Sequence, residues 1–254
     1  MRSINKAIIL AAGKGKRMGG LTSELPKPML RVNNKPVLEH IVRNLAAAGV
    51  KSLLVITGYK AEVIEKYFDD GGPWNCSIRY TRQTTQDGTG KVVELGIDFA
   101  GDDPFLLVYG DILVEPRTYV ELIKNFINKE KASGIVMVKL EEDVAMGAVM
   151  LFDEQFRLKD LIEKPTLEQL KKLQADRRFK RWYNAGLYAF TPSLFSYVKT
   201  LKKSVRGEYE LTDAIRALAK ETRSVYGVEI KGYWIDVRDP ELLAQAQSVV
   251  RSPS

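Results

Sequence analysis

One stretch decides how this chain folds, AIILAAGKGKRM at residues 7–18. Its first four residues are apolar and predict a buried strand, residues 7–10. The glycines and cations that follow predict a tight, positively charged loop. Gly13 and Gly15 allow the backbone to turn and to lie close to a ligand, and successive backbone N–H groups in such a turn form an anion site.

The charges of this loop favour a phosphate ligand. Arg17, and Lys27 further along, add fixed positive charge, and an arginine binds two phosphate oxygens at once. The loop lacks the Gly-Lys-Ser/Thr ending of a P-loop, and its glycine spacing differs from the dinucleotide fingerprint. It therefore indicates a site for a triphosphate or pyrophosphate. On spacing alone, an ordinary βα turn with solvated charges stays open.

Composition narrows the classes of function. The 254 residues could form one large α/β domain or two small ones, and no apolar run approaches the length of a membrane span. The single cysteine, Cys76, excludes an internal disulfide and favours the reducing cytoplasm. The net charge of +7 suits phosphorylated small molecules, a nucleic acid or an anionic membrane surface. The densest basic cluster, residues 177–182, is more typical of a solvated helix end or a subunit contact, so we expect no nucleic-acid or membrane partner.

Strand and helix patterns alternate in the first half of the chain. The expected strands are 7–10, 51–57, 77–80 and 104–108, and the expected helices are 36–48, 61–68 and 91–100. Such a succession predicts an α/β fold with a mostly parallel sheet and helices on both faces, whose ligands bind at the carboxyl ends of the strands. His40, the only histidine, falls outside the apolar stripe of its helix, so we expect it to be exposed and inert.

The pattern changes from about residue 133. The expected strands are 134–140, 147–152, 157–162 and 183–190, some of them antiparallel, and the expected helices are 167–174 and 240–250. No linker rich in Pro, Ser or Gly marks a domain boundary. We therefore expect a single domain over residues 1–254, with both halves packed on one mixed sheet.

Further short motifs follow the first loop along the chain. They are 25–30, Gln83 with 87–90, 109–111, 163–165, 184–188, 207–213 and 234–236. In this order, over residues 5–247, they resemble the signature of the sugar-phosphate nucleotidyltransferases, the nucleoside-diphosphate-sugar pyrophosphorylases, and most closely the uridylyl- and thymidylyltransferases. The resemblance implies the Rossmann-like nucleotide-diphospho-sugar transferase fold, with a nucleotide-binding half at about 1–132 and a sugar-binding half at about 133–250. Some relatives append a left-handed β-helix domain, for which the sequence leaves no room after the helix at 240–250.

The reaction that the resemblance implies joins a sugar-1-phosphate oxygen to the α-phosphorus of UTP or dTTP and releases pyrophosphate. A phosphate monoester is largely dianionic at neutral pH, so the reaction needs no general base, in agreement with the single histidine. The need is to position and neutralise two polyanions. Arg17 and Lys27 would stabilise the departing pyrophosphate, and Lys164 would hold the sugar phosphate.

Two aspartates are candidates for binding Mg²⁺. Asp111 follows an apolar strand, and Asp236 lies in the last motif. Carboxylates at strand ends are usual partners of Mg²⁺, which takes few protein ligands together with phosphate oxygens and water. Aspartates in such places also form turns, which is the alternative for both residues.

The resemblance also implies residues for the base and the sugar. Gln83 and Gly88 would read the base, since a glutamine amide matches the imide edge of uracil or thymine. The main chain of Ala12, Gly13 and Gly15 would contact the nucleotide. The sugar hydroxyls would be held by Gly147, Glu163 and Asn184.

Departures from the family pattern leave alternatives open. Lys16 stands where many relatives carry Thr, Gly19-Gly20 replaces a residue–proline pair, and VRD at 237–239 replaces a Gly-Thr pair after Asp236. The same fold could transfer cytidylyl or guanylyl groups to another phosphorylated substrate, or the chain could be a catalytically silent subunit that binds nucleotide sugars. The sugar, the choice between UTP and dTTP, and a homo-oligomer stay open as well.

Overall fold

The computed structural model describes residues 2–140, 147–175 and 180–250, and the chain forms two compact units. The N-terminal unit comprises Ile4–Gln86, Phe105–Glu121 and Lys231–Ser254, and the middle unit comprises Met1–Ser3, Asp87–Pro104 and Leu122–Ile230. This division differs from the expected halves at residue 132, because the chain returns to the N-terminal unit near its C-terminus.

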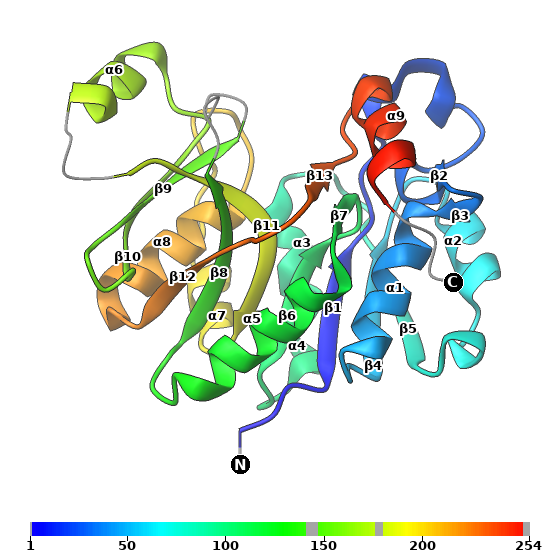
Figure 1. Ribbon diagram of the computed structural model, residues 1–254, viewed down its shortest axis with the longest axis horizontal. Coiled ribbons are helices and arrows are strands. Elements are labelled where there is room, and N and C mark those ends of the chain that lie inside the picture. Colours follow the sequence, from blue (N-terminus) through cyan, green and yellow to red (C-terminus); the bar gives the residue numbers. More distant parts are fainter. Residues whose placement is uncertain (1, 141–146, 176–179, 251–254) are drawn as a thin grey trace. The chain divides into compact units, whose positions relative to one another are not determined.

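A parallel sheet forms the centre of the N-terminal unit (Figure 1). Its strands lie in the order β6 (Phe105–Tyr109), β1 (Lys6–Leu10), β4 (Ser52–Thr57) and β5 (Ser77–Arg82). The register places Ile8 opposite Leu107 on one side and Leu54 on the other. These residues are almost completely buried, as continuous apolar runs predict for parallel strands covered on both faces.

Helices and short ribbons complete this unit. α1 (Val37–Ala47) and α2 (Ala61–Phe68) agree with the expected helices, and α9 (Pro240–Val249) begins where the Asp239 carboxylate accepts a hydrogen bond from the Leu242 N–H at 2.9 Å. Two-stranded ribbons join β2 (Arg31–Val32) to β3 (Lys35–Pro36) and β7 (Ile112–Val114) to β13 (Trp234–Asp236). The second ribbon brings the C-terminal segment back to this unit. None of the described helices has the length and apolar character of a membrane span.

The expectation that His40 is exposed is wrong. Its side chain lies on α1 but is buried, and its Nε2 atom lies 2.9 Å from the Val32 carbonyl oxygen. The helical stripe could not show this, because the burial involves the β2–β3 hairpin, which packs on α1. Burial lowers the pKa of His40 and so favours the neutral ring.

The middle unit is built on a mixed sheet. Its strands follow the order β10 (Leu158–Glu163), β9 (Ala148–Phe152), β11 (Trp182–Phe190), β8 (Gly134–Leu140) and β12 (Val225–Glu229). All neighbours are antiparallel except β12 and β8. The antiparallel strands expected here are therefore present, and the sequence patterns missed only β12.

Helix α8 (Leu211–Thr222) packs on β10 in this unit, and α3 (Thr89–Glu94) packs on α7 (Leu194–Lys199) and α8. The expected helix at 91–100 is divided into α3 and α4 (Ile97–Ala100), with Gly96 between them. The helix expected at 167–174 is α6 (Leu167–Ala175). The patterns missed α7, α8 and the helix Pro116–Asn128.

Arg2, near the N-terminus, binds the segment that follows helix α5 (Pro116–Asn128). Its guanidinium donates hydrogen bonds to the carbonyl oxygens of Lys129 (3.0 Å), Glu130 (2.9 Å) and Ala132 (2.6 Å). The same group lies 3.6 Å above the ring of Phe126. One side chain therefore binds the backbone turn that follows the helix, where the Lys129 carbonyl also accepts a hydrogen bond from the Ala132 N–H at 2.8 Å.

Candidate functional site

The cationic loop after β1 is anchored by two buried residues. Met18 and Thr22 lie inside η1 (Lys16–Thr22), and the Thr22 hydroxyl donates to the carbonyl oxygens of Gly15 (3.4 Å) and Gly19 (3.3 Å). Arg17 is exposed, as are Gly13, Lys14 and Lys16 before it. The loop is thus fixed from within while its positive charge faces solvent, as a binding site for a soluble polyanion requires.

Lys27 lies against this loop, and the absence of a side chain at Gly15 permits this close approach. Gly15 has the left-handed φ of +67°, and a Cβ atom built on it would lie 2.9 Å from the Cβ atom of Lys27. A side chain at position 15 would therefore displace the lysine. The sequence placed both residues at the phosphate loop, and the structure brings them together.

Tyr59 and Lys60 hold the loop from outside, and sequence reasoning did not single them out. The Tyr59 hydroxyl donates to the carbonyl oxygens of Thr22 (3.1 Å) and Ser23 (3.3 Å), and Lys60 Nζ donates to Ser23 at 2.5 Å. The Tyr59 N–H bonds to the Ala12 carbonyl at 3.2 Å. Both residues come just after β4, with Gly58 between them and the strand. Their place near the end of a strand could have identified them from the sequence.

Asp111 and Asp236 meet at the end of the parallel sheet. Asp111 follows β6, where the Gly110 N–H donates to the Leu10 carbonyl at the end of β1 (2.9 Å). Asp236 closes β13 and pairs with Ile112 of β7, and the Val237 N–H donates to the Asp111 carbonyl at 2.9 Å. The β7–β13 ribbon therefore places two carboxylates side by side that are far apart in the sequence.

The charges at this acidic pair are only partly balanced. Lys27 forms an ion pair with Asp111, with side chains 11% and 25% exposed. Burial, together with repulsion from Asp111, raises the pKa of Asp236 to about 6, although Lys27, Arg238 and Arg17 oppose the shift. Arg238, which replaces a small residue of the family pattern, lies 3.8 Å from the Asp236 carboxylate.

The acidic pair fits a hard divalent cation. Two adjacent carboxylates that repel each other gain from a shared positive ion. Among the described residues no group of three or more His, Cys, Asp or Glu side chains could hold a metal. A cation bound here would complete its shell with water and substrate oxygens, which is the ligand set that Mg²⁺ favours.

A second group of predicted residues gathers in the middle unit. Glu163 ends β10 opposite Ala148, and the next residue, Lys164, donates its N–H to the Gly147 carbonyl at 3.0 Å. Lys164 is exposed and adopts a left-handed φ of +43°. Gly147 lies against the ring of Tyr183, where no side chain would fit.

Asn184 belongs to the same group, on β11. Its Oδ1 atom accepts hydrogen bonds from the Tyr188 hydroxyl (2.9 Å) and the Gly186 N–H (3.3 Å). These bonds fix the carboxamide, and among the described residues its NH₂ group is the part left for a ligand. The side chain is therefore held in one orientation, and its contact with a sugar hydroxyl stays a prediction.

The sequence analysis did not single out Arg206, which contacts two carboxylates here. Its guanidinium lies 2.6 Å from Glu210, which is buried, and 3.7 Å from Glu163. Burial and the charge of Glu210 raise the pKa of Glu163, while Arg206 and Lys164 act against the rise. Arg206 directly precedes the motif at 207–213, and this position was the available signal.

Gly88 and Gln83 have structural surroundings that the sequence could not show. Gly88 has φ +119°, and a Cβ atom there would lie 2.5 Å from the backbone N and O of Tyr209. The packing of Tyr209 alone therefore requires a glycine at position 88. Gln83 follows β5, and its N–H donates to the Thr57 carbonyl at 2.7 Å. Contact of either residue with a base stays a prediction.

The predicted residues fall into one cluster in each unit. The triphosphate cluster, in the N-terminal unit, consists of Ala12, Gly13, Gly15, Arg17, Lys27, Gln83, Asp111 and Asp236. The sugar cluster, in the middle unit, consists of Gly147, Glu163, Lys164 and Asn184. Gly88, which is predicted to read the base, also belongs to the middle unit. Members of the triphosphate cluster follow the carboxyl ends of β1, β5 and β6, where parallel sheets bind ligands.

Known proteins share both the sequence and the fold. A glycan biosynthesis nucleotidyltransferase of Haloferax volcanii, Agl11, is 31% identical over 96% of this chain and 66% of its own length. The bifunctional protein GlmU of Methanocaldococcus jannaschii is 37% identical over 92% of this chain, which spans about half (51%) of that relative. A solved UDP-glucose pyrophosphorylase complexed with UDP-glucose matches 96% of this chain and 97% of its own, with a TM-score of 0.84 and 25% identity.

These matches confirm the fold class expected from the sequence, the nucleotide-diphospho-sugar transferase fold. Residues 6–252 also match the family described as Nucleotidyl transferase, which covers nearly the whole chain and both clusters. The chain therefore belongs to the nucleotidyl transferase family.

Proposed function

We propose that this protein transfers a nucleotidyl group from UTP or dTTP to a sugar-1-phosphate and releases pyrophosphate. The observation that carries the proposal is the acidic pair Asp111–Asp236, set beside the cationic loop at the ends of the parallel strands. A catalytically silent subunit would need the loop to bind a nucleotide, but it would have no need of two repelling carboxylates there.

Each residue of the triphosphate cluster has a distinct task in this proposal. Arg17 and Lys27 hold the phosphates that leave as pyrophosphate and stabilise the charge that develops on them. Asp111 and Asp236 would hold Mg²⁺, and the ion would supply positive charge that lowers the repulsion between the two substrates.

The sugar cluster serves the second substrate. Lys164 holds the phosphate of the sugar, and Glu163 and Asn184 bind its hydroxyls. The oriented NH₂ group of Asn184 donates, and the Glu163 carboxylate accepts. The sugar phosphate needs no base to activate it, because it is already largely dianionic at neutral pH.

The base preference is proposed from Gln83. Its amide can both donate to and accept from the imide edge of uracil or thymine, whereas guanine would present a different edge. Unpaired polar groups in a buried site cost about 1–3 kcal/mol each, so guanine is rejected. Discrimination between UTP and dTTP should be weak, since one methyl group contributes only about 1 kcal/mol.

The deciding experiment measures pyrophosphate release from five nucleoside triphosphates with a panel of sugar-1-phosphates and Mg²⁺. We expect turnover with UTP or dTTP and at least one sugar. GTP or ATP outperforming both would overturn the base assignment. Binding of nucleotide sugars without turnover of any pair would identify a silent subunit instead.

Two variants test the division of tasks between the clusters. Arg17→Ala should lower kcat and weaken triphosphate binding, and Lys164→Ala should mainly raise KM for the sugar phosphate. Arg79→Ala, an exposed arginine on β5, is the matched control and should leave both constants unchanged. If Arg17→Ala and Lys164→Ala raised only the KM of the same substrate, the assigned tasks would be wrong. The cytoplasmic location and the oligomeric state stay predictions.

A further inference from the structure

The middle unit contains a positively charged cavity away from the sugar cluster. It has a volume of about 250 Å³ and lies between the β9–β10 turn, the start of β10 and the end of α8. Buried Leu158 and Ala219 contribute its apolar lining. Four cations line the rest, Arg157, Lys159, Lys220 and Arg223.

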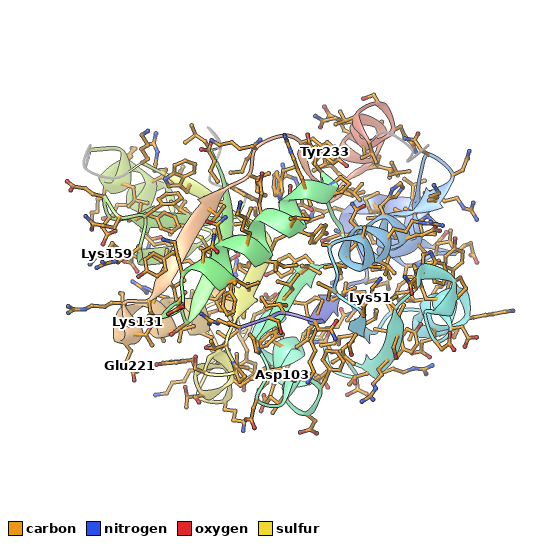
Figure 2. All side chains as sticks on the ribbon, turned by 60° about the horizontal axis from the view of Figure 1, so that its bottom comes forward. Lys51, Asp103, Lys131, Lys159, Glu221 and Tyr233 are labelled. Carbon is orange, nitrogen blue, oxygen red and sulfur yellow. The ribbon has the colours of Figure 1, made fainter. Side chains whose placement is uncertain are left out.

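The carboxylate that lines this cavity belongs to Asp153, and it is hydrogen-bonded within its own turn. Asp153 accepts hydrogen bonds from the N–H groups of Gln155 (3.1 Å) and Arg157 (2.9 Å). The cations, in contrast, are largely free of counter-ions. Within residues 2–140, 147–175 and 180–250 no ion pair is formed by Arg157, Lys159 or Arg223. Lys159 is exposed on β10 (Figure 2).

The remaining charges nearby do not neutralise the cavity. Asp160, the residue after Lys159 on β10, is bound by Arg216 in two hydrogen bonds of 2.5 and 3.1 Å, with Lys220 at 3.3 Å. Glu221 on α8 is engaged by the Tyr197 hydroxyl instead. The end of α8 adds roughly half a negative charge, and the Asp153 carboxylate adds one more, so the four cations leave the cavity with a net positive charge. An anion is therefore the ligand that this electrostatic environment attracts.

We propose that this cavity binds a small molecule that carries one or two phosphate groups. Arginine and lysine side chains that line one cavity match the several oxygens of a phosphate. The volume is somewhat below the roughly 300 Å³ at which small-ligand sites begin, so the cavity suits a small phosphorylated molecule.

The cavity is formed by the far ends of elements that also carry the sugar cluster. β10 runs from Leu158 at the cavity to Glu163, about 17 Å away at the rise of an extended strand. α8 begins beside Glu210 and ends at the cavity. The Asp160–Arg216 contact joins these two elements between the sites. The cavity is therefore a separate site on the same framework.

The test titrates inorganic phosphate and pyrophosphate into the full-length protein by calorimetry, with the metal removed by chelator. Every protein in the series carries Arg17→Ala, which weakens competing binding at the cationic loop. The cavity variant adds Arg223→Gly and Lys159→Ala. Arg223 has a left-handed φ of +52°, which glycine adopts without strain, so this substitution removes the guanidinium and keeps the turn.

The matched control adds Lys199→Ala and Lys202→Ala, two exposed lysines of the same unit outside the cavity. We expect the cavity variant to bind pyrophosphate at least about tenfold more weakly than the control, as the loss of charge-assisted contacts implies. Binding to the control should also weaken with added salt. Thermal unfolding of both variants verifies that they fold.

Equal affinity of the cavity variant and the control would overturn the proposal. So would binding of a DNA or RNA oligonucleotide that depends on Arg223 and Lys159 while neither phosphate probe binds, since that result identifies a nucleic-acid surface. The measurement involves no turnover, so the transferase assay can fail while this site is confirmed, and the reverse.

Discussion

Lowering the pH from about 8 to about 5 should weaken Mg²⁺ binding at the Asp111–Asp236 pair about tenfold. Burial and the neighbouring Asp111 raise the pKa of Asp236 to about 6. A proton must leave this carboxyl before it can bind a metal. At a pH one unit below its pKa, roughly one molecule in eleven has the carboxylate free, and the apparent affinity falls by the same factor.

The same shift predicts how the metal-free protein responds to pH. A carboxyl whose pKa is raised on folding contributes stability below its unfolded value, near 3.8, and this contribution is lost as the pH rises through about 6. The full shift corresponds to about 3 kcal/mol. Asp236→Asn should therefore stabilise the metal-free protein by up to about 3 kcal/mol near neutral pH, and by almost nothing near pH 4.

Calorimetric titration with Mg²⁺ at several pH values tests the first part. In two buffers of different ionisation enthalpy it also counts the protons released, and we expect release near pH 6 and none near pH 8. Urea unfolding of the wild type and of Asp236→Asn tests the second part. Equal Mg²⁺ affinity in acid and in base, or a variant that is less stable near neutral pH, would refute the reasoning.

Three further substitutions test features of the middle unit. Gly88→Ala should cost about 1–3 kcal/mol of unfolding free energy, because Tyr209 leaves no room and φ is positive; wild-type stability in urea would contradict this. Arg2→Ala should cost about 1–2 kcal/mol by removing bonds to the end of α5, measured by the same assay; an unchanged midpoint would show that these bonds are absent in solution. Burial alone would raise the pKa of Asp160, but the hydrogen bond from Arg216 makes the net change a decrease. Asp160→Asn should therefore destabilise the protein above about pH 4, and the difference from wild type should shrink as the pH falls further; a difference that does not change with pH would be a packing effect.

The sequence predicted those parts of the molecule that depend on contiguous residues. The strand at 7–10, the loop after it and the helix at 61–68 each combine a periodic pattern with a clear start and stop, so their positions agree closely with the structure. The parallel sheet follows from their alternation. Family motifs supplied the candidate residues, including those whose local pattern is ordinary.

Contacts across long stretches of chain could not be predicted. The side-by-side placement of Asp111 and Asp236 depends on pairing between β7 and β13, two strands of three residues each, too short to show a period. The burial of His40 involves the β2–β3 hairpin, whose strands have only two residues each. Arg206 looks like any surface arginine until its distances to Glu163 and Glu210 are known.

The β7–β13 ribbon also has a consequence for how the protein is made. The strand that carries Asp236 leaves the ribosome only after residues 115–233 have followed β7. At synthesis rates of about 5–20 residues per second, that interval lasts on the order of ten seconds. Throughout it, the nascent chain can display a cationic loop and Asp111, already paired with Lys27. The acidic pair itself cannot assemble until the second aspartate arrives, so the proposed Mg²⁺ site cannot form earlier.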